Sequence, residues 1–361
     1  MADQLLYAAT CGFEAARQLS ALPAAQRMHG HSFQASVRAQ LPSEWEIFPG
    51  SGVEQLREQL QTCVAPLDYR QLDLVLDDPT DVNLARWLAA RLGLPGRPAR
   101  VGIRSRADTG VELDEHGHAQ VWRRYRFEAA HRLPNVPVGH QCGRMHGHGF
   151  EVVLHAAAER AGGQPIDHQR LDSCWQPLAQ QLRHSCLNEL PGLENPTSEM
   201  LAAWIWRRLQ PQLPELGWVR VYETASCGAN FDGSNYRIWK EFRLDSAVRL
   251  AHAPAGDARR GVHGHTFVLR LHLHAPLDAL LGWTIDYGDV KSRFDPVFRD
   301  LDHHPLHERA ELADADGASL ARWIRARAGA LLPQLERLDL YQSPGCGVIL
   351  NWGDAGPVVP I

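Results

Sequence analysis

The tripeptide His-Gly-His occurs four times in this chain of 361 residues. Three copies begin at His29, His146 and His263, each 117 residues after the one before, and each is followed by one small residue and a phenylalanine. For 19 histidines and 30 glycines, chance gives about 0.08 such tripeptides. The fourth copy, at 116–118, follows two acidic residues and precedes no strand-like run, so we interpret it as a turn. A period of 117 residues is too long for a solenoid and predicts three copies of a small domain.

We place the three modules at residues 1–119, 120–234 and 235–361. The segment after each regular His-Gly-His alternates apolar and polar side chains, which predicts a strand of an antiparallel sheet that is covered on one face. Amphipathic helices and short strands follow in each copy. We expect helices at 171–182, 84–92, 199–209 and 320–332, and strands at 101–104, 218–223 and 338–342. No Pro/Ser-rich linker separates the modules, so we expect them to pack tightly.

The composition argues against several classes of protein. Lys and Arg number 37 against 42 Asp and Glu, with no long run of one sign, which is untypical of proteins that bind nucleic acid or a membrane surface. No apolar run approaches the roughly 18 residues of a membrane span, and the N-terminus does not resemble a signal peptide. Seven scattered cysteines indicate reduced thiols. We therefore expect a cytoplasmic protein that binds neither nucleic acid nor a membrane.

Module two carries the residues of a metal site. His146 and His148 are two positions apart on a predicted strand, so their imidazoles point to the same face. A preceding antiparallel strand that ends at His131 would bring a third imidazole. Three histidines and one open position form the arrangement of a catalytic zinc site, and the alternative is a set of hydrogen-bonded strand histidines. Cys142 is either a fourth ligand or a base beside the metal, and spacing alone leaves both roles open.

Modules one and three lack parts of this set. The position of His131 holds Arg17 in module one and Val248 in module three, and the position of Cys142 holds Ala25 and Arg259. Two histidines without a third ligand bind zinc weakly, so we expect no tight zinc site in either module. The remaining histidine pairs are interpreted as strand histidines without a ligand role.

At this point the sequence resembles a known family. Module two is similar to the bacterial 6-carboxytetrahydropterin synthases of the 6-pyruvoyl-tetrahydropterin synthase superfamily, through the blocks 127–150, 187–199 and 221–224. Module three resembles it through 282–287 and 301–304, and module one more weakly through Asp68-Tyr69 and 79–81.

The resemblance implies a fold class: α+β, with four antiparallel strands and two helices per module, the tunnelling fold. In the family, three subunits close a 12-stranded barrel. Three fused copies then imply that one chain closes a pseudo-trimeric barrel with helices outside and polar strand faces inside, which removes exposed sheet edges. Stacking of two such rings would give a homodimer.

The resemblance also implies roles for single residues. Zinc would be held by His131, His146 and His148, with Cys142 as the general base. Glu223 would anchor the pterin, helped by Ser198 and Glu199. A carboxylate suits this task because a pterin edge offers two parallel donors to a fork of two oxygens. Modules one and three have Ser105 and Gln342 at the position of Glu223.

The family completes its site with an Asp-His pair from a neighbouring subunit. Module two has Arg183-His184 at this position and module one has Asp68-Tyr69, whereas module three keeps Asp302-His303. The losses are complementary, so we expect one composite site per chain, in which module three gives Asp302 and His303 to the zinc site of module two. His184, or a residue of a second chain, is the alternative partner of Cys142.

The function implied is a zinc-dependent lyase that converts 7,8-dihydroneopterin triphosphate to 6-carboxy-5,6,7,8-tetrahydropterin, on the route to queuosine-type deazapurines. One alternative is a 6-pyruvoyltetrahydropterin synthase, which uses the same substrate and metal. The other is a non-catalytic protein that binds a pterin or purine.

Overall fold

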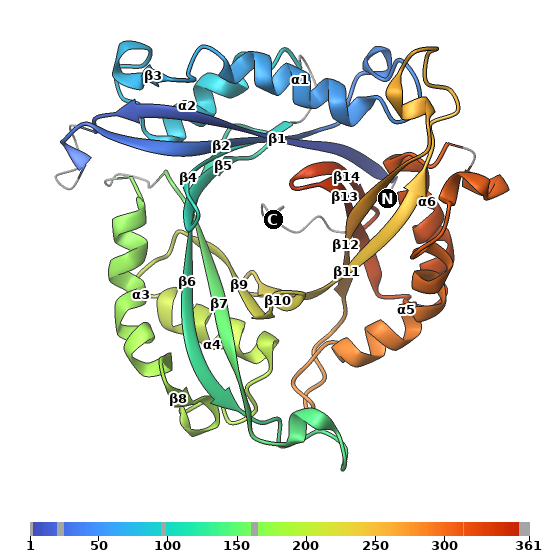
Figure 1. Ribbon diagram of the computed structural model, residues 1–361. Helices are drawn as coiled ribbons and strands as arrows, with labels where there is room; N and C mark the ends of the chain where they lie inside the picture. The colour runs from blue at the N-terminus through green and yellow to red at the C-terminus, as the bar shows by residue number, and fades with distance from the viewer. Residues whose placement is uncertain (1–2, 20–24, 95–98, 160–164, 313, 354–361) are drawn as a thin grey trace. The chain divides into compact units, whose positions relative to one another are not determined.

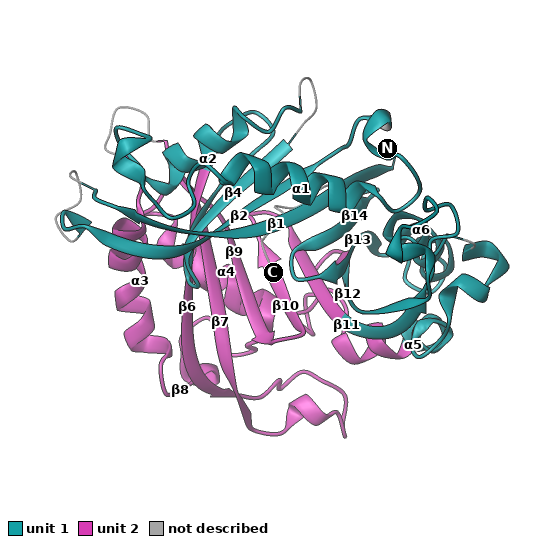
Figure 2. Ribbon diagram, turned by 45° about the horizontal axis from the view of Figure 1, so that its top comes forward, with its two compact units in different colours: residues 1–119, 242–271, 293–361 teal, residues 120–241, 272–292 magenta. Residues whose placement is uncertain are grey.

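The computed structural model describes residues 3–19, 25–94, 99–159, 165–312 and 314–353 (Figure 1). The chain divides into two compact units (Figure 2): residues 1–119, 242–271 and 293–361 form unit 1, and residues 120–241 and 272–292 form unit 2. Module two thus lies in unit 2, module one lies in unit 1, and module three contributes to both. No helix that the structure describes is long and apolar enough to cross a bilayer.

Module one forms two long strands, two helices and two further strands. Its elements are β1 (Gln4–Arg17), β2 (His29–Ala39), η2 (Ser43–Trp45), α1 (Gly52–Val64), β3 (Arg70–Gln71), η3 (Leu72–Leu74), α2 (Asp81–Ala89), β4 (Ala99–Arg106) and β5 (Thr109–Leu113). β1 pairs with β2, β2 with β4 and β4 with β5, all antiparallel. α1 packs on β1 and α2 on β4 and β5 (Figure 1). The fourth His-Gly-His lies in the turn after β5, as predicted.

Module two repeats this order. Its elements are β6 (Ala119–His131), η4 (Gln141–Gly143), β7 (His146–Ala157), α3 (His168–Leu182), β8 (Ser185–Cys186), η5 (Leu187–Glu189), α4 (Ser198–Leu209), β9 (Leu216–Thr224) and β10 (Cys227–Phe231). β6 pairs with β7, β7 with β9 and β9 with β10. α4 packs on β9 and β10, so the helix at 199–209 predicted from the sequence covers this part of the sheet.

Module three gives the order a third time. Its elements are β11 (Tyr236–Val248), η6 (Ala258–Arg260), β12 (His263–His274), α5 (Tyr287–Leu301), η7 (Leu306–Glu308), η8 (Ala310–Leu312), α6 (Gly317–Ala328), β13 (Leu335–Ser343) and β14 (Cys346–Asn351). The predicted fold class of three tandem modules is therefore confirmed. Neighbouring modules share continuous sheet within each unit: β10 pairs with β11 in unit 2, and β14 pairs with β1 in unit 1.

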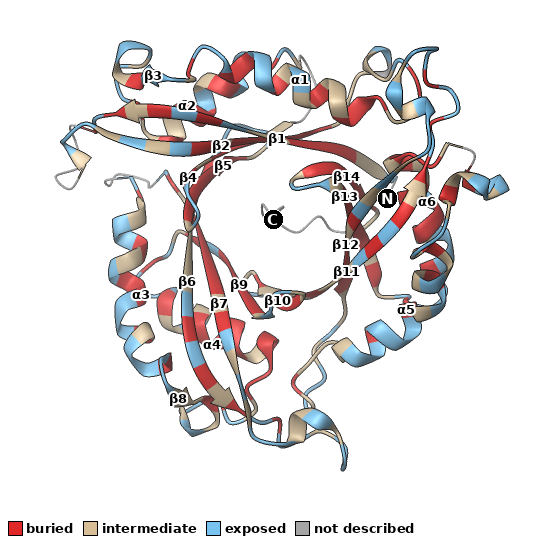
Figure 3. Cartoon of the chain, viewed as in Figure 1, coloured by how far each residue is buried: buried red, intermediate tan, exposed pale blue. Residues whose placement is uncertain are grey.

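The polar faces of the strands are buried. In unit 1, Arg38 of β2 lies 2.8 Å from Glu112 of β5, and Arg337 lies 2.7 Å from Asp339 on β13. These side chains are at most 10% exposed, and Figure 3 shows long buried stretches on the strands of both units. Buried charges are paired in proteins because an unpaired charge loses its hydration. The polar side chains that alternate with apolar ones along the strands are predicted to face inward. In unit 1, charged side chains on the strands form buried ion pairs.

The same turn recurs after the first helix of each module. Tyr69, His184 and His303 have φ values of 51°, 55° and 58°, in the left-handed region that side chains other than glycine rarely adopt. Their backbone N–H groups donate to the carbonyls of Glu14, Glu128 and Asp245. The turn therefore ties the end of the helix to the first strand in all three copies, and these three residues occupy equivalent positions.

Candidate metal and ligand site

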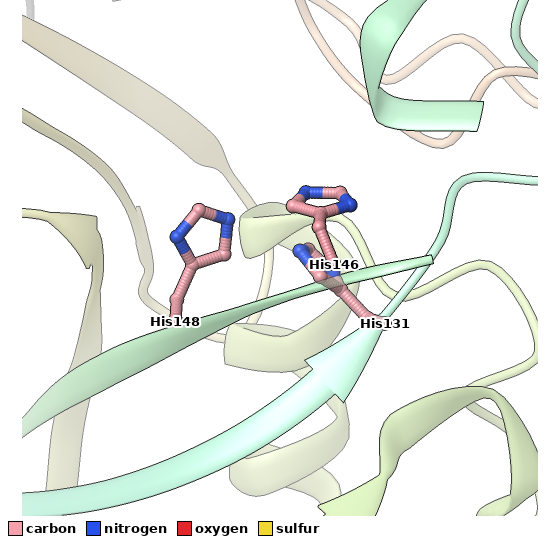
Figure 4. A group of neighbouring side chains, drawn as sticks. All are labelled: His131, His146 and His148. Carbon is pink, nitrogen blue, oxygen red and sulfur yellow. The ribbon is translucent and has the colours of Figure 1, made fainter. Parts of the chain in front are cut away.

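The three predicted ligand histidines meet at the ends of β6 and β7 (Figure 4). The antiparallel register places His131 opposite His146 and Ala129 opposite His148. The ring centroids of His131 lie 4.5 Å from His146 and 5.1 Å from His148. One ligand atom from each histidine lies within 4.8 Å of the other two. Among the described residues this is the one such group of three or more His, Cys, Asp or Glu side chains.

Hydrogen bonds turn two of these rings so that they can act as ligands. His131 Nδ1 lies 3.0 Å from the carbonyl oxygen of Pro196, and His146 Nδ1 lies 2.8 Å from that of Arg144. An Nδ1–H that donates to a carbonyl fixes the tautomer and leaves the Nε2 lone pair for a metal. Gly147 fits between the two ligands of β7 because a Cβ there would lie only 3.2 Å from the carbonyl oxygen of Ala129.

The electrostatics of the triad suit a cation. Burial lowers the pKa of His131 to about 4. The hydrogen bond to Pro196 acts in the opposite direction, and the neighbouring His146 and His148 lower the pKa a little further. Burial, and then His146, lower the pKa of His148. The Nε2 atoms of His131 and His148 are buried without a hydrogen-bond partner. Neutral imidazoles with orphaned nitrogens fit a bound metal ion, which would accept their lone pairs.

Glu223, near the end of β9, lies beside the triad, with its Oε1 3.6 Å from His148 Nε2. Its side chain is 14% exposed. Burial raises the pKa of Glu223 to about 7, and the nearby carboxyl of Glu199 adds to the rise, whereas a hydrogen bond from Ser198 opposes it. The structure therefore brings Glu223 together with Ser198 and Glu199, and their role in binding a pterin stays a prediction.

Ser198 and Glu199 begin α4, which is capped by Thr197. Both residues are buried, and Ser198 Oγ lies 3.3 Å from Glu199 Oε2. Glu199 Oε1 accepts hydrogen bonds from the backbone and hydroxyl of Thr284, at 2.8 and 3.1 Å. Burial nevertheless raises the pKa of Glu199.

Module three takes part in this site through residues 280–287, which belong to unit 2. Besides Thr284, Tyr287 OH lies 2.7 Å from Ser198 Oγ, and Thr197 donates to the carbonyl of Gly282 at 2.5 Å. Residues 282–287 form one of the blocks that resemble the family, and the sequence alone predicts no role for them. The residues that this block contacts lie more than 80 positions away in the chain, so no local pattern indicates the contacts. The resemblance of the block to the family is the one sequence feature that points to it.

Cys142 lies in the short helical turn η4 between β6 and β7 and is half-buried. It does not belong to the group of ligand atoms formed by the triad. Burial raises the pKa of Cys142 to about 11, and the charges of Glu223 and Asp286 add to the rise, with Cys227 a further contributor. A cation bound at the triad would act in the opposite direction.

Asp302 and His303 form the predicted pair at the end of α5, with His303 Nδ1 2.9 Å from Asp302 Oδ2. This hydrogen bond, and then the charge of Asp302, raise the pKa of His303, which is exposed. Asp302 also accepts from the backbone of Asp245 at 2.9 Å. The pair belongs to unit 1 and the triad to unit 2, so its pairing with Cys142 stays a prediction. In module two, His184 is also exposed, with its Nε2 3.7 Å from Glu128.

The third-ligand position of the other modules is filled by other groups. In module one, Arg17 Nη1 donates to the carbonyl of Pro79 at 2.8 Å, as His131 does to Pro196 in module two. In module three, Val248 is 2% exposed and belongs to the core. Histidine pairs remain in both modules, and the ring centroids of His29 and His31 lie 5.0 Å apart.

Comparisons with known proteins show which family the chain is similar to. A family model described as 6-pyruvoyl tetrahydropterin synthase matches residues 120–234 and 237–351, more than half of the chain. A 6-carboxy-5,6,7,8-tetrahydropterin synthase from Synechocystis is 36% identical over 119 residues, which are 31% of this chain and 91% of that protein. A dihydroneopterin monophosphate aldolase from Pyrococcus furiosus is 30% identical over 105 residues, 28% of this chain and 89% of the relative. Among solved structures, the 6-pyruvoyl tetrahydropterin synthase of Caenorhabditis elegans is 20% identical, with 29% of this chain and 89% of that chain covered and a TM-score of 0.27.

Proposed function

Because the chain belongs to the 6-pyruvoyl tetrahydropterin synthase family, we propose that it is a zinc-dependent lyase of pterin metabolism. Its reaction would convert 7,8-dihydroneopterin triphosphate to 6-carboxy-5,6,7,8-tetrahydropterin, on the route to queuosine-type deazapurines, at one site per chain in module two. The observation that carries this proposal is the triad of His131, His146 and His148, which lies beside the buried carboxyl of Glu223. The Nε2 atoms of His131 and His148 are buried there without a hydrogen-bond partner.

Zinc suits the triad because three imidazole ligands leave one coordination position open for substrate. A zinc ion bound there would polarise oxygen atoms of the substrate side chain as a Lewis acid. His131 and His146 are held for this task by their carbonyl partners, which keep the two rings in position before a metal arrives.

Glu223 is proposed to bind the pterin ring. A pterin edge presents an amino group and a ring N–H, and an ionised carboxylate accepts both. Such donors favour the charged form of a carboxyl group, so they would offset the burial that raises the pKa of Glu223 in the free protein. From the start of α4, the hydrogen bond from Ser198 favours the ionised form of this carboxyl, whereas the charge of Glu199 opposes it.

Cys142 is proposed as the general base at the carbon atoms of the substrate side chain. It lies outside the ligand group, which favours a base over a fourth zinc ligand. His303 is proposed to exchange a proton with Cys142, with Asp302 orienting the imidazole and stabilising its charged form.

Metal content and product analysis test the proposal together. The purified protein should hold one zinc ion per chain, and incubation with 7,8-dihydroneopterin triphosphate should give 6-carboxytetrahydropterin by mass spectrometry. A 6-pyruvoyl product would identify the alternative, a 6-pyruvoyltetrahydropterin synthase, which is the activity in the description of the family model. An aldol cleavage product would point to the reaction in the name of the Pyrococcus furiosus relative. Binding without turnover would indicate a pterin-binding protein.

A further inference from the structure

The turn that carries Cys142 is held by a histidine that contacts module three. His140 caps η4, and its Nδ1 accepts a hydrogen bond from the backbone N–H of Cys142 at 3.2 Å. Since Nδ1 is the acceptor, the proton of the neutral ring lies on Nε2. That Nε2 lies 3.5 Å from Oδ2 of Asp286, and both side chains are about three-quarters buried. The ring of Trp283 also lies against His140, with centroids 5.9 Å apart.

Asp286 is fixed from its other side. Its Oδ1 accepts hydrogen bonds from the backbone N–H groups of Gly288 and Asp289 at the start of α5, at 2.7 and 3.1 Å. The carboxylate therefore cannot rotate freely, and its second oxygen is directed to His140. Asp286 thus caps α5, and His140 caps the turn that carries Cys142. The contact between these two side chains joins module three to module two within unit 2.

Module three shows that the turn itself does not require a histidine. At the equivalent position Asp257 caps η6 and accepts from the backbone N–H of Arg259, which stands where module two has Cys142. An aspartate satisfies the same N–H and is a preferred capping residue. What histidine adds in module two is a second polar atom, which reaches beyond the turn to Asp286.

We infer that Asp286 and His140 are positioning residues that hold Cys142 toward the metal triad, so that module three controls the geometry of the base in module two. The expected effect of these two residues on turnover rests on the proposed function, whereas their role in positioning the Cys142 thiol does not. Asp286 and His140 both belong to unit 2, whereas Asp302 and His303 belong to unit 1. The negative charge of Asp286 also contributes to the raised pKa of the Cys142 thiol, after burial and Glu223 and before Cys227.

Two substitutions break the contact and keep each cap. Asp286→Asn keeps an oxygen for Gly288 but has no second acceptor for His140. His140→Asn keeps an acceptor for the Cys142 N–H but is too short to reach Asp286. The matched control is Asp167→Asn, because Asp167 caps α3 directly before its first residue, as Asp286 does for α5, and accepts from Arg170 at 2.9 Å.

The first readout does not depend on turnover. The rate at which iodoacetamide alkylates Cys142 is followed by mass spectrometry of its peptide in the zinc-loaded protein, with Cys186 as the internal reference. Asp286→Asn and His140→Asn should each raise this rate severalfold, the double variant should match the single ones, and Asp167→Asn should leave it unchanged. Equal rates in all variants, or the same rise in Asp167→Asn, would overturn the inference.

The second readout is catalytic. A small displacement of a reacting group lowers turnover steeply, so each variant should lower kcat by about tenfold or more, with KM within about twofold. Additive losses in the double variant would show that the two residues act separately and would contradict the inference. If the wild-type protein does not convert the pterin substrate, the proposed function fails, while the alkylation rates still decide the positioning role.

Discussion

Arg17 and Asp81 form a buried ion pair in module one, with Arg17 Nη1 2.7 Å from Asp81 Oδ1. Ser105 donates to the other oxygen of the same carboxylate at 2.6 Å. The equivalent positions of module two hold His131, Ser198 and Glu223, which are ligand and anchor candidates. Module one therefore fills the place of a metal ligand and a substrate anchor with a closed network of its own side chains.

This network predicts a stability effect in module one. Arg17→Met should lower the free energy of unfolding by about 3–5 kcal/mol, because it leaves Asp81 buried without its counter-charge. The double variant Arg17→Met/Asp81→Ser should recover most of the loss, since the unpaired charge is removed. Urea unfolding followed by tryptophan fluorescence measures both, with zinc content as a control that should not change. A single variant as stable as the wild type would contradict the assignment.

Equivalent histidines of different modules should differ in metal binding. His146→Ala should reduce bound zinc from one ion per chain to almost none, because two imidazoles hold the ion weakly. His263→Ala removes the equivalent residue of module three and should leave the metal content unchanged. Elemental analysis after dialysis against a mild chelator gives both values. Loss of zinc in the His263 variant would mean that module three also holds metal.

Parts of this site follow from the sequence by local rules. Side chains two apart on a strand share a face, which places His146 beside His148, and the antiparallel partner ends at His131. The contact of Asp286 with His140 joins residues 146 positions apart, and no local pattern indicates it. Arg17 was interpreted as a lost ligand, but its partner Asp81 is 64 residues away and becomes visible only when the strand and the helix are packed together.

Cys142→Ala separates the two roles that the sequence left open. If the thiol is a base, the variant should keep zinc and lose turnover by about a hundredfold or more, because general acid–base groups contribute on this scale. If the thiol is a ligand, zinc should be lost as well. Zinc content and single-turnover rates with the pterin substrate are measured on the same preparation. Cys186→Ala is the control for unspecific effects of removing a half-buried thiol.

The pH dependence of stability should depend on His155. This residue is fully buried and stacked on Trp218, with ring centroids 3.5 Å apart. Burial, with Arg220 and Arg124 adding, holds the pKa of His155 well below its usual value. The unfolded chain binds a proton below about pH 6.5 and the folded chain does not, so the wild type loses stability as the pH falls from there.

His155→Phe keeps an aromatic stack and removes this titration. Between pH 6 and 5 the free energy of unfolding should then fall less steeply, by about 1 kcal/mol per pH unit. Urea unfolding at several pH values measures the slope. Parallel slopes for wild type and His155→Phe would refute the prediction.

The three residues of the recurring left-handed turn give the sharpest test of the composite site. Tyr69, His184 and His303 share a backbone conformation and the hydrogen bond from their N–H, so alanine at each position should perturb the fold to a similar degree. Their side chains differ in chemistry, because only His303 is paired with an aspartate next to it, which raises its pKa and makes it a better proton acceptor. His303→Ala should therefore lower kcat by about a hundredfold, whereas Tyr69→Ala and His184→Ala should leave it within about twofold. Zinc content and melting temperature, measured on all three variants, show whether the loss is specific to chemistry. A loss of turnover in His184→Ala with His303→Ala active would instead assign the partner of Cys142 to module two itself.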